Sequence, residues 1–212
     1  MNIILIGPPA CGKGTQAKSL CKKFDLVHLS TGDLFREIVS QNSPLANEIK
    51  SYIDNGKFVP DELTIKLVEN KLSEIDSQKG ILFDGFPRTV FQAEMLEKSV
   101  KIDYVFEIKI SEQSMVKRVL DRGVCLKCGK SFLLSQTNFK CCDVCGGEIG
   151  HRKDDTEVIA KNRYQDFMQK TYPILNYFKD HKGYKVIDGE LSIDEVFNQI
   201  CNEITKWEIW FI

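Results

Sequence analysis

The stretch Gly7-Pro8-Pro9-Ala10-Cys11-Gly12-Lys13-Gly14-Thr15 decides how the rest of the chain is organised. It follows an apolar run, Ile3 to Ile6, that is typical of a short buried strand, and it precedes residues 16–24, whose apolar side chains recur at helical spacing. A strand, a glycine-rich turn and a helix start form the context of a phosphate-binding loop. Glycines at positions 7, 12 and 14 let backbone N–H groups approach an anion, and Lys13 and the helix N-terminus add positive charge.

This loop departs from the usual pattern at one position. Gly14 stands where Ser or Thr normally follows the lysine, so Thr15 would have to serve in its place. An ordinary glycine turn between a strand and a helix is the alternative interpretation. The strand, the spacing and the lysine together favour a nucleotide site.

Length and charge restrict the class of protein. A chain of 212 residues can bury one core with a small insert. The formal net charge is −1, so no global basic field favours nucleic acid or a membrane surface. Met1-Asn2 leads directly into the first strand, so we expect no signal peptide, and no apolar stretch approaches the roughly 20 residues of a membrane span. We therefore expect a soluble, cytoplasmic protein of enzyme size.

Four further apolar runs predict strands, at residues 26–29, 81–83, 104–110 and 184–187. Helical patterns fill the intervals, which predicts an α/β fold with a five-stranded parallel sheet and helices on both faces. Two segments leave this pattern, a helical flap with few apolar residues at 30–59 and an insert at 122–157. The apolar tail, 207–212, is expected to dock onto the core.

The eight cysteines are unevenly distributed, because five of them lie within positions 125–145. Such clustering without a secretory signal indicates a metal site in a reducing compartment. Two Cys-x2-Cys knuckles with 13 residues between them are close to the spacing of a structural zinc ribbon. Cys141 competes for the third position, but only Cys142 repeats the two-residue gap. The predicted ligands are Cys125, Cys128, Cys142 and Cys145.

The remaining cysteines and the histidines carry no predicted chemistry. Cys11, Cys21 and Cys201 are isolated, so we interpret them as buried small residues, although Cys11 in the loop could be sensitive to oxidation. No role is assigned to His28, His151 or His181.

Asp84 and six arginines are the candidates for magnesium and phosphate binding. Asp84 ends a buried strand, where nucleotide-binding sheets hold magnesium, usually through water; a turn-forming aspartate before glycine is the alternative. Arginine binds phosphate oxygens bidentately, whereas lysine offers a point charge. Arg118 and Arg122 are four residues apart on an expected helix, so we expect both to point from one face with an anion between them. Only six of the 29 basic residues are arginines: Arg36, Arg88, Arg118, Arg122, Arg152 and Arg163.

Several motifs together resemble the long form of adenylate kinase, whose lid holds zinc. The resemblance covers the chain up to its tail and implies a P-loop core at 1–29, 60–121 and 158–212, an AMP-binding flap at 30–59 and a zinc lid at 122–157. The motifs are Gly7 to Thr15 with Gln16-Ala17, Ser30-Thr31-Gly32-Asp33, Asp84-Gly85-Phe86-Pro87-Arg88 and Arg152-Lys153-Asp154-Asp155.

The same resemblance implies a role for each candidate residue. On the ATP side it implies Gly7, Gly12, Lys13, Gly14, Thr15, Arg118 beside the adenine and Arg122 at the phosphates. On the AMP side it implies Thr31, Arg36, Val59 through its backbone, Gly85, Arg88, Gln92, Arg152 and Arg163. Magnesium would be held by Thr15 and, through water, by Asp84, and the catalytic residues would be Lys13, Arg88, Arg122, Arg152 and Arg163.

The implied reaction is phosphoryl transfer from Mg-ATP to AMP, which gives two ADP, by a monomeric enzyme with one structural zinc ion and with no nucleic-acid or membrane partner. A sister kinase that uses UMP or CMP is one alternative. A zinc-ribbon nucleic-acid binder that uses ATP as a switch is another, because residues 122–153 hold six basic side chains against two acidic ones. Binding to single-stranded RNA that falls steeply with salt would support that second alternative.

Overall fold

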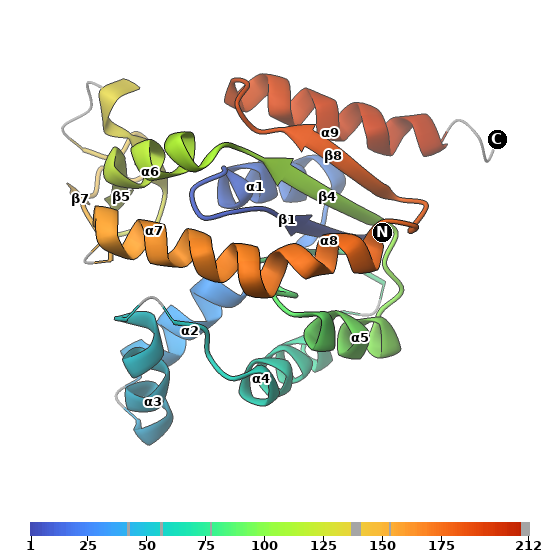
Figure 1. Ribbon diagram of the computed structural model, residues 1–212, viewed down its shortest axis with the longest axis horizontal. Helices are drawn as coiled ribbons and strands as arrows, with labels where there is room; N and C mark the ends of the chain where they lie inside the picture. Colours follow the sequence, from blue (N-terminus) through green and yellow to red (C-terminus); the bar gives the residue numbers. More distant parts are fainter. Residues whose placement is uncertain (42, 56, 77, 137–140, 153, 209–212) are drawn as a thin grey trace.

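A five-stranded parallel sheet in the order β2-β3-β1-β4-β8 forms the centre of the protein (Figure 1). The computed structural model describes residues 1–41, 43–55, 57–76, 78–136, 141–152 and 154–208. The prediction of a five-stranded parallel sheet is confirmed. Its strands are β1 (Asn2–Ile6), β2 (Val27–Ser30), β3 (Ile81–Asp84), β4 (Tyr104–Lys109) and β8 (Tyr184–Asp188).

Helices cover both faces of this sheet, as its apolar strands require. On β1, Ile3 and Leu5 belong to one buried cluster, and Ile4 and Ile6 belong to another on the opposite face. The first cluster is covered by α1 (Lys13–Phe24), α6 (Glu112–Leu120) and α9 (Ile193–Glu208). The second is covered by α4 (Asp61–Ser73), α5 (Val90–Ser99) and α8 (Tyr172–Phe178). None of the helices in the described part of the chain has the length and apolar character needed to cross a membrane.

The first excursion consists of α2 (Thr31–Ser40) and α3 (Pro44–Ile53), at the lower left of Figure 1. Each helix starts at a serine whose hydroxyl accepts a hydrogen bond from a backbone N–H, Ser30 for α2 and Ser43 for α3. The sequence predicts few apolar contacts in this segment, but the segment buries an apolar cluster of its own. Its buried members are Phe35, Ile38, Ala46, Ile49 and Val59.

The second excursion is a small antiparallel sheet in the order β6-β5-β7. Its strands are β5 (Arg122–Cys125), β6 (Ser131–Leu133) and β7 (Ile149–Gly150), and a short 3₁₀ turn, η1 (Leu134–Gln136), follows β6. The buried apolar cluster of its described part has only three members, Cys125, Phe132 and Cys142. Such a small cluster cannot stabilise an independent fold, so this segment needs another source of order.

A long helical segment joins this small sheet to the far side of the main one (Figure 1). It runs through α7 (Glu157–Asp166), a π-helical turn η2 (Phe167–Thr171) and α8. The expected kink at Tyr172-Pro173 takes the form of this π-helical turn, because Pro173 has no N–H to continue the regular ladder. The tail that we expected to dock, 207–212, is only partly described: residues 207 and 208 end α9, and residues 209–212 lie outside the described residues.

Candidate active site

The loop after β1 has the backbone of an anion site. Gly12 adopts φ 100° and caps α1, a conformation that favours glycine. A Cβ on Gly7 would lie 2.5 Å from the backbone oxygen of Ile108, so the loop can pass β4 this closely only without a side chain. Lys13 turns back over the loop, and its Nζ donates to the carbonyls of Gly7 at 2.7 Å and Pro8 at 2.8 Å. The charge of Lys13 therefore lies over the loop, within reach of a phosphate bound there.

The isolated cysteines are buried or partly buried, as expected. Cys11 is 3 % exposed and Cys201 4 % exposed. Burial, followed by the nearby charge of Asp84, raises the pKa of the Cys21 thiol to about 11. Burial keeps reagents from these thiols, so the three positions fit a packing role.

Asp84, at the end of β3, lies beside the loop as predicted. A Cβ on Gly14 would be 3.5 Å from Asp84 Oδ2, and His28 Nε2 lies 3.4 Å from the same oxygen. Asp84 and the hydroxyl of Thr15 in the first turn of α1 are oxygen donors of the kind that magnesium prefers. His28 had no predicted role; its place on β2, next to β3, brings it to this carboxylate.

A small cavity lies on the flap side of the sheet, and all but one of its lining residues come from the flap, α4 and the loop after β3. Thr31 Oγ1 donates to the carbonyl of Gly85 at 2.8 Å, which joins the flap to that loop. Phe35, Phe58 and Thr64 were not predicted; Thr64 Oγ1 donates to the carbonyl of Val59. The lining residues are Thr31, Phe35, Phe58, Val59, Thr64, Gly85, Arg88 and Gln92.

Arg88 lines this cavity, and no carboxylate in the described part of the chain forms an ion pair with it. Its Nε donates to the carbonyl of Gly85 at 2.8 Å, and its guanidinium lies 5.2 Å from the centre of the Phe58 ring. Burial and then the positive charge of Arg163 lower the pKa of Arg88 to about 10, although Asp84 opposes this. The guanidinium therefore contacts neutral groups, and the charges of Arg163 and Arg36 repel it while that of Asp84 attracts it.

Four further arginines influence one another's charge, and they come from the flap, the second excursion and α7. Burial, then the charges of Arg122 and Arg36, lower the pKa of Arg152 to about 10. The pKa of Arg163 is lowered too, chiefly by burial. We call Arg36, Arg88, Arg122, Arg152 and Arg163 the arginine cluster, because each of them lowers the pKa of another member or has its own lowered by one.

Acidic side chains hold three of these arginines. Arg122 makes a bidentate pair with Asp155, whose side chain is 1 % exposed, and Arg163 Nη1 donates to Asp154 Oδ2 at 2.8 Å. Arg36 pairs with Asp33. The sequence contained the two aspartates only as part of a family motif, and no local pattern predicted which arginine each would hold.

The expectation that Arg118 and Arg122 share a helix face is wrong. Helix α6 ends at Leu120, and Arg122 is the first residue of β5, where it pairs with Leu133 of β6. Arg118 Nη2 instead donates to the carbonyl of Gly189 at 2.8 Å. A helical repeat cannot continue once the chain enters a strand, so the two guanidiniums have different partners.

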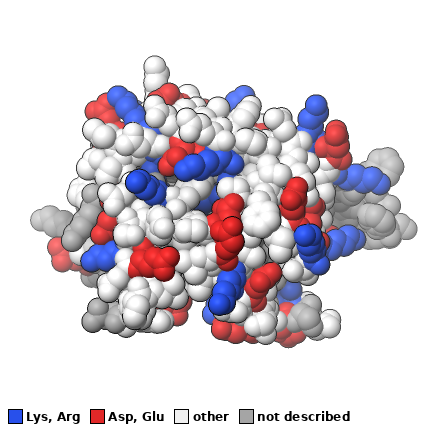
Figure 2. Space-filling model, turned by 60° about the horizontal axis from the view of Figure 1, so that its bottom comes forward, with Lys and Arg blue, Asp and Glu red and all other residues white. Residues whose placement is uncertain are grey.

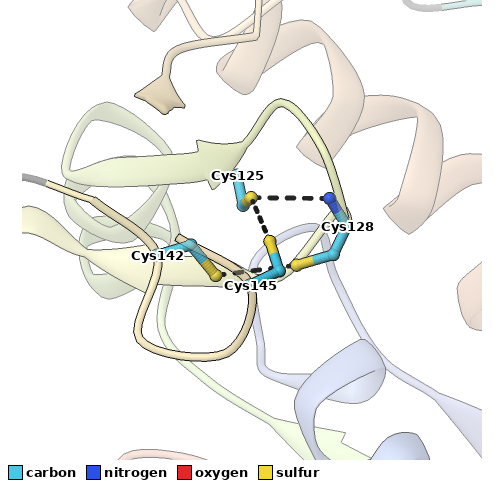
Figure 3. A group of neighbouring side chains, drawn as sticks. All are labelled: Cys125, Cys128, Cys142 and Cys145. Atoms are coloured by element: carbon cyan, nitrogen blue, oxygen red, sulfur yellow. Dashed lines mark hydrogen bonds between the residues drawn. The ribbon is translucent and has the colours of Figure 1, made fainter. Parts of the chain in front are cut away.

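The four predicted cysteines converge in the second excursion (Figure 3). Their Sγ atoms lie within 4.8 Å of one another. Cys125 and Cys145 are 3.5 Å apart at sulfur, and Cys128 and Cys142 are 3.6 Å apart. Four thiolates about 2.3 Å from one zinc ion in tetrahedral geometry would be about 3.8 Å apart, so the group fits this metal.

Backbone groups support the same four sulfurs. The N–H of Cys128 donates to Cys125 Sγ and the N–H of Val144 donates to Cys142 Sγ, each at 3.4 Å. The first of these bonds is the main reason why the pKa of Cys125 is lowered, to about 6. Cys141 is exposed and belongs to a backbone bridge with Glu148, and it is not a member of the group.

Comparisons with known proteins agree with this geometry. The family model described as adenylate kinase matches residues 5–183. The chain is 44 % identical over 209 residues to the adenylate kinase of Clostridium perfringens strain SM101, covering 95 % of this chain and 97 % of that protein. It is 45 % identical over 210 residues to the adenylate kinase of Clostridium botulinum strain 657, with the same coverage.

Proposed function

This chain belongs to the adenylate kinase family and is a nucleoside monophosphate kinase that transfers a phosphoryl group reversibly from Mg-ATP to AMP, and from that premise we propose how its own residues perform the transfer. Five arginines and one lysine bind, orient and stabilise the phosphates. The flap at 30–59 and the lid at 122–157 close over a core formed by 1–29, 60–121 and 158–212.

The arginine cluster is the observation that carries this proposal. Among the described residues Arg88 and Arg152 form no ion pair, and burial and neighbouring guanidiniums lower the pKa of each. Bringing like charges together inside a fold costs free energy that an anion between them would recover. Planar guanidiniums match phosphate oxygens bidentately, so the natural anion here is a set of phosphates.

We assign Arg36 and Arg88 to the AMP phosphate, and Thr31, Gln92 and the backbone of Val59 and Gly85 to the AMP base and its surroundings. All but Arg36 line the small cavity, which supports a single binding place. Arg152 and Arg163 act on the phosphoryl group in transfer. No observation favours UMP or CMP as the acceptor.

We assign the donor phosphates to the loop amides of Gly7, Gly12 and Gly14, to Lys13 and to Arg122, and we assign the ATP adenine to Arg118. The loop carbonyls that Lys13 now contacts are weaker partners than a phosphate, so ATP draws its Nζ toward the terminal phosphates.

Phosphoryl transfer needs little covalent help from the protein. Its transition state is loose, with charge spread over the phosphoryl oxygens, so catalysis consists of positioning and electrostatic stabilisation. This explains a site built from Lys13, Arg88, Arg122, Arg152 and Arg163, with no histidine or cysteine nucleophile. Closure of the lid excludes water, which would otherwise hydrolyse ATP.

Two metal ions complete the proposal. Magnesium enters with ATP, held by Thr15 and through water by Asp84, and when bound it neutralises charge on the phosphate oxygens. Zinc is held by Cys125, Cys128, Cys142 and Cys145. With four protein ligands it has no open position, so its role is to order the lid.

We expect a monomer that acts in the cytoplasm without nucleic acid. The absence of a nucleic-acid partner is supported by Figure 2, where basic and acidic side chains are interspersed on the face shown. Two of the six basic residues counted in 122–153, Lys140 and Lys153, lie outside the described residues. Bound phosphates account for the positive charge of the arginine cluster.

A coupled assay of ADP formation tests the assignment of the acceptor. ADP should form from Mg-ATP only when AMP is added, and UMP or CMP at the same concentration should give less than a tenth of that rate. Formation of ADP without an acceptor would contradict the proposed exclusion of water. Equal rates with UMP would contradict the assignment of the base site to adenine.

A further inference from the structure

Asp61 lies in the first turn of α4, and both of its carboxylate oxygens accept hydrogen bonds from side chains at the start of α5. Its Oδ2 accepts a hydrogen bond from Thr89 Oγ1 at 2.6 Å, and its Oδ1 accepts one from Gln92 Nε2 at 2.8 Å. Among the described residues it has no lysine or arginine partner. Its oxygens are therefore directed at the start of α5, beside the cavity that Gln92 lines.

These contacts allow only one orientation of the Gln92 amide. A carboxylate can only accept, so Nε2 must face Asp61, and Oε1 accepts from the backbone N–H of Arg88 at 2.7 Å. Turning the amide over would place two acceptors together on one side and two donors on the other. Gln92 is 2 % exposed, so water would not relieve that mismatch.

The orientation matters for recognition of the base. An amide has two N–H donors and two lone pairs, and one of each is used by Asp61 and Arg88. One N–H of Nε2 and one lone pair of Oε1 remain for the base, and their positions are fixed because the amide cannot turn over. Adenine presents an acceptor at N1 beside a donor at the 6-amino group, whereas a 6-oxopurine presents a donor at N1 beside an acceptor at O6. A freely turning amide would accommodate either base.

We propose that Asp61 is a specificity-determining positioning residue, which selects adenine over a 6-oxopurine by holding the Gln92 amide in one orientation. The inference rests on the proposed contact between Gln92 and the AMP base. A role limited to stabilising the N-terminus of α4 would need only a negative charge in the first turn, and Glu62 supplies one there as well. The two cross-helix hydrogen bonds are particular to Asp61.

Steady-state kinetics with AMP and with inosine monophosphate test this role, because the two acceptors differ in the base only at positions 1 and 6. For Asp61→Ala we expect kcat/KM with AMP to fall about tenfold or more, the effect of losing a hydrogen bond to a charged group. The ratio of kcat/KM for AMP to that for inosine monophosphate should fall by about the same factor. The KM for ATP should stay within about twofold of wild type.

Two further variants separate orientation from helix stability. Glu62→Ala removes the neighbouring exposed acid of the same turn and should leave the ratio unchanged. Asp61→Asn keeps one acceptor but can also present a donor, so its ratio should lie between those of wild type and Asp61→Ala. If Asp61→Ala does not fold, as judged by its thermal transition, the ratio measured for Asp61→Asn decides.

Gln92→Leu distinguishes failure of the inference from failure of the site assignment. An unchanged ratio in both Asp61 variants, with a lowered ratio in Gln92→Leu, would overturn the role of Asp61 and leave the base contact in place. An unchanged ratio in Gln92→Leu would remove the proposed base contact, and the inference with it. A lowered ratio in Asp61→Ala and Gln92→Leu, with an intermediate ratio in Asp61→Asn and a wild-type ratio in Glu62→Ala, would support both.

Discussion

Arg88 shows what a single guanidinium can do that an ammonium cannot. One of its nitrogens donates to Gly85, and Phe58 packs against its plane, so the side chain is oriented before any phosphate arrives. The two terminal nitrogens of the guanidinium can then bind phosphate oxygens. Preorganisation of this kind reduces the entropy lost when the ligand binds.

Replacing Arg88 by lysine should keep the fold and lose most of the activity. Arg88→Lys keeps one positive charge but loses the bidentate hydrogen bonds to phosphate and the hydrogen bond to Gly85. We expect kcat/KM for AMP to fall at least tenfold, because a charge-assisted hydrogen bond contributes roughly 1.5 to 3 kcal/mol. Initial rates over a range of AMP concentrations measure this, and a turnover and KM for AMP both within about twofold of wild type would contradict it.

Lys13 should act mainly on the transition state. Lys13→Met should still bind ATP through the loop amides, so we expect kcat to fall by orders of magnitude while KM for ATP changes less. Lys18→Met, an exposed lysine on the same helix, is the matched control and should behave like wild type. A normal kcat with a raised KM would show that Lys13 contributes only to ground-state binding.

At the scale of elements, the lid is the part that cannot fold on its apolar residues alone. Its described core contains two cysteines and one phenylalanine. Lys130 adds a contact between the two knuckles, because its Nζ lies 2.7 Å from both carboxylate oxygens of Asp143. Partly exposed ion pairs contribute little, so we attribute the order of this element chiefly to the metal.

The adjacent pair Cys141 and Cys142 provides a sharp test of the metal site. Purified protein should contain one zinc ion per chain. Cys142→Ser should lower the zinc content and the melting temperature, with a smaller loss of activity at low temperature, since the metal orders the lid and does no chemistry. Cys141→Ser should change neither quantity much, because its sulfur is not in the group. Loss of zinc in Cys141→Ser alone would make the ligand assignment wrong.

At the scale of the whole molecule, the two excursions stand at the end of the main sheet where its phosphate loop lies (Figure 1). Helix α7 carries Arg163 and begins next to the lid, so movement of the lid and placement of this arginine are linked through one rigid element. The arginine cluster draws on both excursions and on the core. We expect charge repulsion within it to oppose closure until phosphates are bound.

Substrates should therefore close the molecule together. We predict that a protease cleaves residues 122–157 more slowly with a non-hydrolysable ATP analogue plus AMP than with either alone, because only both together supply phosphates to all five arginines. The time course of fragments on a denaturing gel measures this. UMP in place of AMP is the control and should add little protection, and equal protection by the ATP analogue alone would contradict a role for AMP in closure.

Local patterns in the sequence were enough to predict the sheet, the loop after its first strand and the group of four cysteines. A buried parallel strand, a left-handed glycine before a helix and a two-residue gap between thiolates each depend on neighbours within a few positions. Backbone geometry relates such neighbours directly, so residues 7–15 and the two knuckles were interpretable without a fold.

Contacts between distant segments were decided only by the tertiary structure. Asp61 contacts Gln92, His28 contacts Asp84 and Arg122 contacts Asp155, although the members of these pairs are 31 to 56 positions apart in the sequence. Strand order, register and the packing of helices on the sheet bring these residues into contact. The periodicity of the sequence does not predict such contacts. The tertiary structure also separates Arg118 on α6 from Arg122 on β5, whereas a helical repeat predicts that they share one face. A pattern determines which element a residue belongs to, whereas the partner of a charged side chain depends on how the whole chain packs.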